Sequence, residues 1–268
     1  MAITALDSAA SGLSALNTAL DVTANNLANV NTQGFKGSRA NFQDLLYVER
    51  AQPGVENSIG DQRPTGLYVG LGVKVSGTQV DFDQGAPIAT GRELDVTING
   101  RGFFRVKVQD SLGDGYAYTR AGNFALNRDG EIVLANDQGR RLDPNIQIPE
   151  DATAISINDN GEIYVDRPGL TDPELVGQLE IATFINPQGL KSMGENLYLQ
   201  TDASGPPVLG VPGEDQRGSL KQKFVENSNV DPTVELINLI KTQRAFEMNS
   251  NTVRTADETL RTVATLKR

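Results

Sequence analysis

The sequence predicts an α+β protein in which N- and C-terminal helices pair as a coiled-coil-like hairpin around an inserted, mostly antiparallel all-β domain. Apolar residues recur at helical spacing over residues 4–31 and again from residue 231 onward. Between them, residues 67–224 alternate with a period of two, and turn residues interrupt the pattern every eight to fifteen positions. Because the helical patterns stand near the two ends, pairing them would display the β domain as an insertion.

The N-terminal pattern is a heptad repeat that predicts a helix over residues 4–31. Its two interleaved sets are Leu6, Leu13, Leu20 and Leu27, and Ala9, Leu16, Thr23 and Val30. We expect Gly34 and Gly37 to end the helix, with Phe35 folding back on it. An ordinary amphipathic helix packed on the core of its own domain remains an alternative interpretation.

The C-terminal pattern predicts a second helix that opens at Asp231-Pro232, with Asp231 as the cap and Glu235 in the first turn. Its two sets are Leu239, Phe246, Val253 and Leu260, and Thr242, Asn249, Ala256 and Val263. A single terminal helix docked on the β domain is the alternative. Because the apolar seam is short, we expect the ends to order on assembly.

These two patterns define an expected assembly interface, which we call the helical seam. Its predicted members are Leu6, Leu13, Leu16, Leu20, Leu27, Val30, Leu239, Phe246, Val253, Leu260 and Val263. The expected domain limits are 1–40 for the N-terminal helix, 41–70 for an extended linker or arm, 71–226 for the β-rich domain and 227–268 for the C-terminal helix.

The segment after the first helix predicts either a short helix or an extended arm over residues 41–48, followed by a linker at 51–66 that is rich in turn residues.

Further along, Asp129-Gly130 and Asn160-Gly161 stand between alternating apolar residues and favour type I′ hairpin turns. A calcium loop is a poorer interpretation, because the pattern lacks the third acidic position and the later glutamate.

The composition excludes several function classes. The chain has 268 residues, no Cys and no His, and a net charge of −10. Thiol catalysis, Cys/His zinc sites and His bases are therefore excluded, and the acidic balance disfavours nucleic acid. We expect no catalytic residue, no metal, no cofactor and no small-molecule substrate.

A carboxylate-based hydrolase using Glu131, Glu162 and Asp166 is an alternative, although acids at hairpins usually face solvent. No cleavable signal or membrane span is expected.

Several stretches resemble the bacterial flagellar rod and hook proteins. The segment from Ala24 to Lys36 is similar to the N-terminal signature of that family, through the motif residues Asn25, Asn26, Leu27, Ala28, Asn29, Gly34 and Phe35. Residues 227–250 resemble its C-terminal signature, and residues 100–104, 118–124 and 194–198 resemble its β domain. The stretches at 44–47, 52–54 and 70–73 look most like those of distal-rod members.

The resemblance implies a non-enzymatic subunit of a self-assembling helical tube that transmits torque as a rigid drive shaft. It implies proximal-rod and hook-type axial proteins, surrounding basal-body rings and the flagellar export apparatus as partners. It implies a periplasm-spanning rod in the basal body, exported without a cleaved signal peptide. A proximal-rod or hook-type subunit is the alternative, and the length of the linker distinguishes the two.

Overall fold

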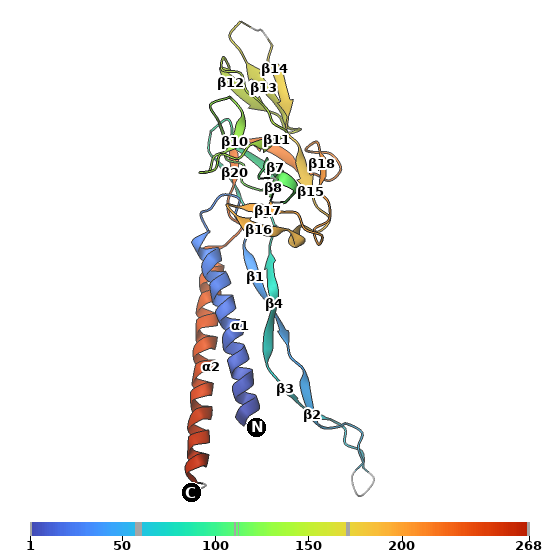
Figure 1. Cartoon of the computed structure of the whole chain (residues 1–268), viewed down its shortest axis with the longest axis vertical. Coiled ribbons are helices and arrows are strands. Elements are labelled where there is room, and N and C mark those ends of the chain that lie inside the picture. Colours follow the sequence, from blue (N-terminus) through green and yellow to red (C-terminus); the bar gives the residue numbers. More distant parts are fainter. Residues whose placement is uncertain (1, 57–60, 110, 112, 170–171, 267–268) are drawn as a thin grey trace. The chain divides into compact units, whose positions relative to one another are not determined.

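The computed structural model describes residues 2–56, 61–109, 111, 113–169 and 172–266 (Figure 1). The chain forms two compact units. The helical unit consists of Met1–Ala28, Ser38–Val80 and Asp231–Arg268, and the β unit consists of Asn29–Gly37 and Asp81–Val230. The chain therefore crosses from one unit to the other four times, after residues 28, 37, 80 and 230.

Two long helices belong to the helical unit, α1 (Ala2–Ala28) and α2 (Pro232–Leu266). The α2 helix begins as predicted, because the Asp231 carboxylate accepts hydrogen bonds from the backbone N–H groups of Thr233 (2.8 Å) and Val234 (3.3 Å). The α1 helix ends earlier than predicted. A turn at Asn29–Thr32 follows it, closed by the Thr32 N–H donating to the Asn29 carbonyl. Val30 is therefore not on the helix.

A long ribbon completes the helical unit (Figure 1). It consists of two successive two-stranded ladders. Its strands are β1 (Ser38–Asp44), β2 (Tyr47–Ala51), β3 (Leu67–Gly70) and β4 (Val73–Val80), with β1 paired to β4 and β2 to β3, both antiparallel. The extended alternative for residues 41–48 is therefore the one observed. The Glu56–Gln62 bridge continues the ribbon into the predicted linker, of which residues 57–60 lie outside the described residues.

The two units differ from the expected domain limits at residues 29–37 and 227–230, which belong to the β unit, and at residues 71–80. We expect residues 71–80 to open the β domain, but β4 forms its ladder with β1 in the helical unit. The alternating pattern predicted the strand, whereas strand partners are set by pairing over long sequence distances.

The β unit is built from antiparallel sheets. Its largest sheet has the order β16-β17-β8-β7-β15-β18, with β11 also paired to β7, and β12-β13-β14 form a three-stranded sheet. Three further pairs are β9 with β10, β6 with β19 and β5 with β20. The bounds are β5 (Pro87–Ala89), β6 (Val96–Asn99), β7 (Phe103–Lys107), β8 (Tyr116–Thr119), β9 (Phe124–Leu126), β10 (Ile132–Leu134), β11 (Leu142–Asp143), β12 (Ala154–Ile157), β13 (Glu162–Asp166), β14 (Glu174–Gln178), β15 (Ile181–Thr183), β16 (Lys191–Gly194), β17 (Leu197–Leu199), β18 (Val208–Gly210), β19 (Ser219–Gln222) and β20 (Phe224–Glu226). Two short 3₁₀ turns, η1 (Gly113–Gly115) and η2 (Pro187–Gly189), connect strands.

The hydrophobic core of the molecule lies in the β unit. Its fully enclosed side chains come from several strands and include Ile98, Phe104, Phe124, Ile132, Ile163, Ile181, Leu197 and Leu220. Phe104 and Phe124 meet edge to face at 5.1 Å between ring centroids. Burial of these side chains supplies the main stabilisation of the unit.

The two predicted hairpins form, but their turns are not of type I′. Gly130 and Gly161 have positive φ values of 74° and 86°, whereas Asp129 and Asn160 do not have positive φ. The hydrogen bonds from Gly130 N–H to the Asn127 carbonyl and from Asn127 N–H to the Glu131 carbonyl indicate a turn with a glycine bulge instead. A type I′ geometry occurs at Glu195-Asn196, where both φ values are positive.

Within the described residues, neither helix is apolar enough along its length to cross a membrane.

Candidate functional site: the helix pair and a buried charged junction

The two helices of the helical unit lie side by side and run antiparallel. The Asn26 amide Nδ2 donates to Glu235 Oε1 at 3.0 Å, and a Cβ placed on Gly12 would lie 2.9 Å from Asn249 Nδ2. The two contacts lie 14 residues apart on α1 (26 − 12) and also 14 residues apart on α2 (249 − 235). One antiparallel register therefore accounts for both contacts. Gly12 thus stands where α2 approaches α1 closely.

The predicted seam residues are placed as follows. Leu6, Leu13, Leu16, Leu20, Leu27, Leu239, Phe246 and Val253 are half-buried in their helices. Val30 is half-buried in the turn after α1, and Leu260 is exposed. The side chain of Val263 lies outside the described residues. The most buried positions of α1 are the smaller residues Ala9, Gly12, Ala15, Thr23 and Asn26. The leucine pattern did not identify Gly12 or Ala15.

Asn26 is the motif residue with the clearest structural role in the helical unit. Its side chain is 3% exposed, and its amide pairs with the backbone of Ser38 in both directions. Nδ2 donates to the Ser38 carbonyl at 2.7 Å, and Oδ1 accepts from the Ser38 N–H at 3.0 Å. With its bond to Glu235, Asn26 joins α1, β1 and α2. All three of these partners lie within the same chain.

The ribbon meets α1 at the corner between β3 and β4. Ser11 Oγ accepts a hydrogen bond from the Val73 N–H at 3.3 Å and donates to the Ser8 carbonyl at 2.9 Å. Gly72 has a φ of 115°, and a Cβ there would lie 2.2 Å from Ser11 Oγ. Glycine at residue 72 therefore allows the ribbon to approach the helix.

Gly34 and Phe35 of the same motif belong to the β unit. Gly34 has a φ of 70°, and its N–H donates to the Glu226 carbonyl at 2.8 Å. A Cβ on Gly34 would lie 2.6 Å from the backbone nitrogen of Ala121. Phe35 is half-buried. Glycine is required at residue 34 both for its backbone conformation and for space.

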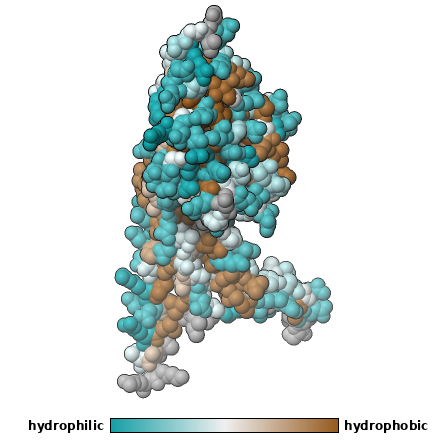
Figure 2. Space-filling model, turned by 45° about the horizontal axis from the view of Figure 1, so that its top comes forward, coloured by the Kyte–Doolittle hydropathy of each residue, from teal (hydrophilic) through white to brown (hydrophobic). Residues whose placement is uncertain are grey.

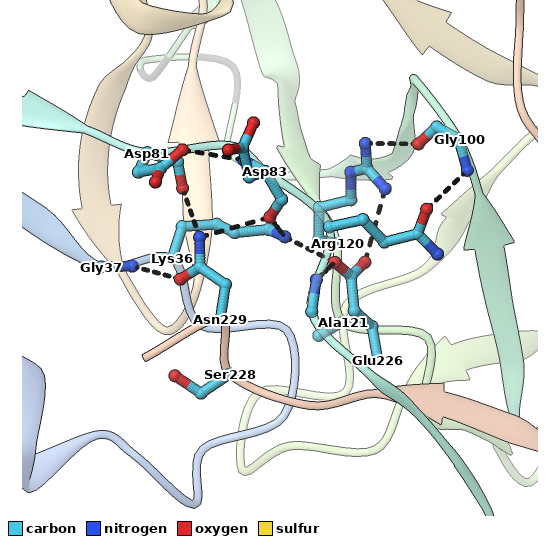
Figure 3. Close-up of polar contacts among 12 residues, drawn as sticks. Lys36, Gly37, Asp81, Asp83, Gly100, Arg120, Ala121, Glu226, Ser228 and Asn229 are labelled. Carbon is cyan, nitrogen blue, oxygen red and sulfur yellow. Dashed lines mark hydrogen bonds and ion pairs between the residues drawn. The ribbon is translucent and has the colours of Figure 1, made fainter. Parts of the chain in front are cut away.

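Lys36, Arg120 and Glu226 form a buried charged junction (Figure 3). Lys36 Nζ is 2.5 Å from Glu226 Oε1, and Arg120 Nη1 is 3.4 Å from Glu226 Oε2. The three side chains are 0%, 3% and 0% exposed, respectively. Burial lowers the pKa of Lys36 and that of Arg120, against the opposing effect of the Glu226 charge. Because it holds both cations, Glu226 is the centre of the junction.

Backbone groups complete the junction. Lys36 Nζ also donates to the Asp83 carbonyl at 2.6 Å, and Glu226 Oε1 accepts from the Gly85 N–H at 2.9 Å. Arg120 Nη2 donates to the Gly100 carbonyl at 2.8 Å (Figure 3). These bonds compensate for the desolvation of the charges, which is the condition for tolerating a buried ion cluster.

Neighbouring side chains hold the carboxylates of Glu131 and Glu162, which the hydrolase hypothesis names. Glu131 accepts hydrogen bonds from Asn145 (2.8 Å) and Asn127 (2.7 Å), and Glu162 accepts one from the Tyr164 hydroxyl (3.1 Å). Hydrogen bonds from Asn145 and Asn127 lower the pKa of Glu131, and hydrogen bonds from Asn160 and Tyr164 lower the pKa of Glu162. A general acid requires a raised pKa, so neither carboxyl suits that role. Within the described residues, no cluster of acidic side chains could hold a metal ion.

Lowering the pH should destabilise the β unit through Glu131. Hydrogen bonds from Asn145 and Asn127 hold its folded-state pKa below the ordinary value of 4.5. Their stabilisation is therefore present above pH 4.5 and is lost as the pH falls through the folded-state pKa. We expect Asn145→Ala to raise the pKa of Glu131 in an NMR carboxyl titration. Asn160→Ala is the matched control, because it should shift Glu162 and leave Glu131 unchanged. The reverse pattern would contradict this assignment.

Three family models match the chain. Residues 6–36 match "Flagella basal body rod protein", residues 97–165 match "Flagellar hook protein FlgE/F/G D1 domain", and residues 221–266 match "Flagellar basal body rod FlgEFG protein C-terminal". Each matched range contains one residue of the charged junction, namely Lys36, Arg120 and Glu226.

Full-length relatives agree with these models. The chain is 43% identical to the flagellar basal-body rod protein FlgG of Caulobacter vibrioides, over 98% of this chain and 99% of the relative. It is 45% identical to FlgG of Agrobacterium fabrum, over 95% of each chain.

The chain belongs to the flagellar basal-body rod protein family.

The flagellar hook protein FlgE of Escherichia coli, by contrast, is 25% identical to this rod protein. The rod protein is a structural, non-enzymatic component of the flagellar basal body, and it is a subunit of the distal rod. The prediction of a distal-rod subunit is confirmed, and the alternative of a proximal-rod or hook-type subunit is not favoured. Membership also implies self-assembly into the rod and association with other axial proteins.

Proposed function

We propose that α1 and α2 form a coiled-coil-like hairpin, and that this hairpin is the part of the subunit that interlocks with other copies in a helical tube. The antiparallel register and the half-buried seam residues support this proposal. Gly12 and Ala15 add to the support, since small residues permit the close helix approach that a densely packed tube requires.

Exposed apolar side chains on α2 supply the contacts between copies. Val234, Leu236, Ile237 and Ile240 are 47–52% exposed, and apolar surface is visible along the helical unit in Figure 2. In the observed register, Ala2 lies opposite about residue 259, so the last turns of α2, including Leu260, extend past α1. When one part of α2 on one copy packs against a different part of the helices on the next copy, the contact is heterologous. Contacts of this kind build an open filament.

The ribbon formed by β2 and β3 adds contacts between subunits and stiffens the tube. An isolated two-stranded ribbon is marginal in water. Its side chains Tyr47, Leu67 and Tyr68 are 51–58% exposed, so they are available for burial against a neighbour. The predicted arm at residues 41–70 includes this ribbon.

The assembled tube transmits torque as a rigid drive shaft across the periplasm. Its partners are proximal-rod and hook-type axial proteins at the ends, the surrounding basal-body rings, and the flagellar export apparatus that delivers the subunit without a cleaved signal peptide. The family models for rod and hook proteins support the axial partners. The resemblance in sequence supports the remaining assignments.

Replacing Leu13 by aspartate should abolish tube formation and leave the β unit folded. Leu13 is half-buried in α1, and an unpaired charge at such a position is costly. The measurement is sedimentation and electron microscopy of the full-length chain, with near-UV circular dichroism as the check on the β unit. Asn17→Asp, on an exposed position of the same helix, is the control that should still assemble. Normal tubes from Leu13→Asp would refute the role of the seam.

A further inference from the structure

The charged junction lies where the chain passes between its two units. The chain leaves or enters the β unit after residues 28, 37, 80 and 230. Within the β unit, the segments next to these points are hydrogen-bonded to one another. The Gly37 N–H donates to Asn229 Oδ1 at 2.8 Å, and the Asp81 N–H donates to the Gly37 carbonyl at 2.8 Å. Asn229 Nδ2 donates to the carbonyls of Asp81 (2.9 Å) and Asp83 (3.2 Å).

These hydrogen bonds join residues that stand next to three of the four crossings. Gly37, Asp81 and Asn229 each lie within two residues of a crossing. The remaining crossing, after residue 28, leads into the segment that contains Gly34, whose N–H is bonded to the Glu226 carbonyl. Figure 3 shows Lys36, Gly37, Asp81, Asp83, Glu226 and Asn229 converging.

The three charged side chains connect this set of crossings to the core of the β unit. Lys36 joins the first crossing segment to the Asp83 carbonyl and to Glu226. Glu226 ends β20, just before the last crossing. Arg120 follows β8 in the largest sheet and also lies over the ring of Phe103 in β7, 5.3 Å from its centroid. Glu226 therefore links the crossing segments to the central sheet, through its carboxylate to Lys36 and Arg120 and through its backbone carbonyl to Gly34.

A buried ion cluster contributes little net stability, because desolvation offsets the attraction between the charges. Its charge-assisted hydrogen bonds are directional, however. They all form together in one arrangement of the crossing segments. An apolar cluster of similar volume can repack when the segments shift. This difference matters for a subunit whose function is mechanical.

We propose that the Lys36–Arg120–Glu226 junction is the torsional clamp of the subunit, which holds all four crossing segments as one rigid body in the β unit. The clamp makes four covalent connections act together, so that the tube resists twisting and bending more than four independent linkers would. This inference rests on the proposed assembly into a tube. In this role, Lys36, Arg120 and Glu226 are positioning residues.

The test uses the full-length chain with Glu226→Gln and Lys36→Met. Glu226→Gln keeps the shape and removes the charge that holds both cations, and Lys36→Met removes one cation while the Arg120–Glu226 pair remains. Glu195→Gln is the matched control, since it removes a carboxylate from the Arg140–Glu195 surface ion pair in the same unit. Two quantities are measured: hydrogen exchange at the amides of Gly34, Gly37 and Asp81 in the monomer, and the persistence length of the tubes in electron micrographs.

We expect both junction variants to assemble. Exchange at the three crossing amides should rise by about tenfold or more, while the amides of β7 and β8 stay protected. The tubes should bend more, with a shorter persistence length than tubes of the wild type or of Glu195→Gln. If Glu226→Gln does not fold, Lys36→Met decides the outcome.

The results separate two failures. If the wild-type chain forms no tubes, the proposed function is wrong. If the wild type forms tubes, and tubes of the folded junction variants are as stiff as those of Glu195→Gln, the clamp is refuted, whether or not exchange is faster.

Discussion

Replacing Gly34 by alanine should destabilise the β unit by about 3 kcal/mol or more. A φ of 70° costs a residue with a Cβ about 1–2 kcal/mol. The new Cβ would also lie 2.6 Å from the backbone nitrogen and 2.8 Å from the Cα of Ala121, so backbone must move. That movement pulls the Gly34 N–H away from the Glu226 carbonyl, which costs a further hydrogen bond of about 1 kcal/mol.

The measurement is urea unfolding of the full-length chain, followed by near-UV circular dichroism. Gly91→Ala is a matched control, because Gly91 has a φ of 75° and an added Cβ there would meet nothing within 4 Å. The control shares the backbone strain without the steric overlap. If the two variants lose the same free energy of unfolding, the contact with Ala121 is unimportant and strain alone explains the glycine.

Replacing Asn26 by leucine should prevent the helical unit from ordering. The substitution removes three hydrogen bonds, to the Ser38 N–H, the Ser38 carbonyl and Glu235 Oε1. The backbone N–H and carbonyl of Ser38 then lose these partners and lie next to an apolar side chain. The loss lowers the free energy of unfolding by about 1–3 kcal/mol for each buried group. The total, about 3–5 kcal/mol, is comparable to the whole stability of a small helical unit.

Circular dichroism at 222 nm reports on this unit selectively, because both α-helices that the structure describes belong to it. We expect Asn26→Leu to show less of that signal than the wild-type chain and to form no tubes. Asn17→Leu is the control on the same helix, at an exposed position. A monomer of Asn26→Leu with wild-type helicity and normal assembly would show that Asn26 does not hold the unit together.

Much of the architecture followed from local pattern. The heptads predicted two terminal helices, Asp231-Pro232 predicted the start of α2, and alternation over residues 67–224 predicted the β-rich segment that contains β7, β8, β12 and β13. These features depend on residues close in the sequence, whose spacing and propensity decide their conformation with little help from elsewhere. The motif stretches likewise sufficed for the family, because they are specific short sequences.

The charged junction and the contacts of the helical unit were decided only by the tertiary structure. Lys36, Arg120 and Glu226 are 84 and 106 residues apart along the chain (120 − 36 and 226 − 120), and no spacing links them. Asn26 belongs to neither heptad set, and its role follows only from its pairing with Ser38. The pairing of β1 with β4 was also decided by the tertiary structure, because the local sequence of a strand does not identify the strand it pairs with. Local pattern thus determines which elements form, whereas long-range polar contacts determine how they are held, since the partners of a buried charge meet only after folding.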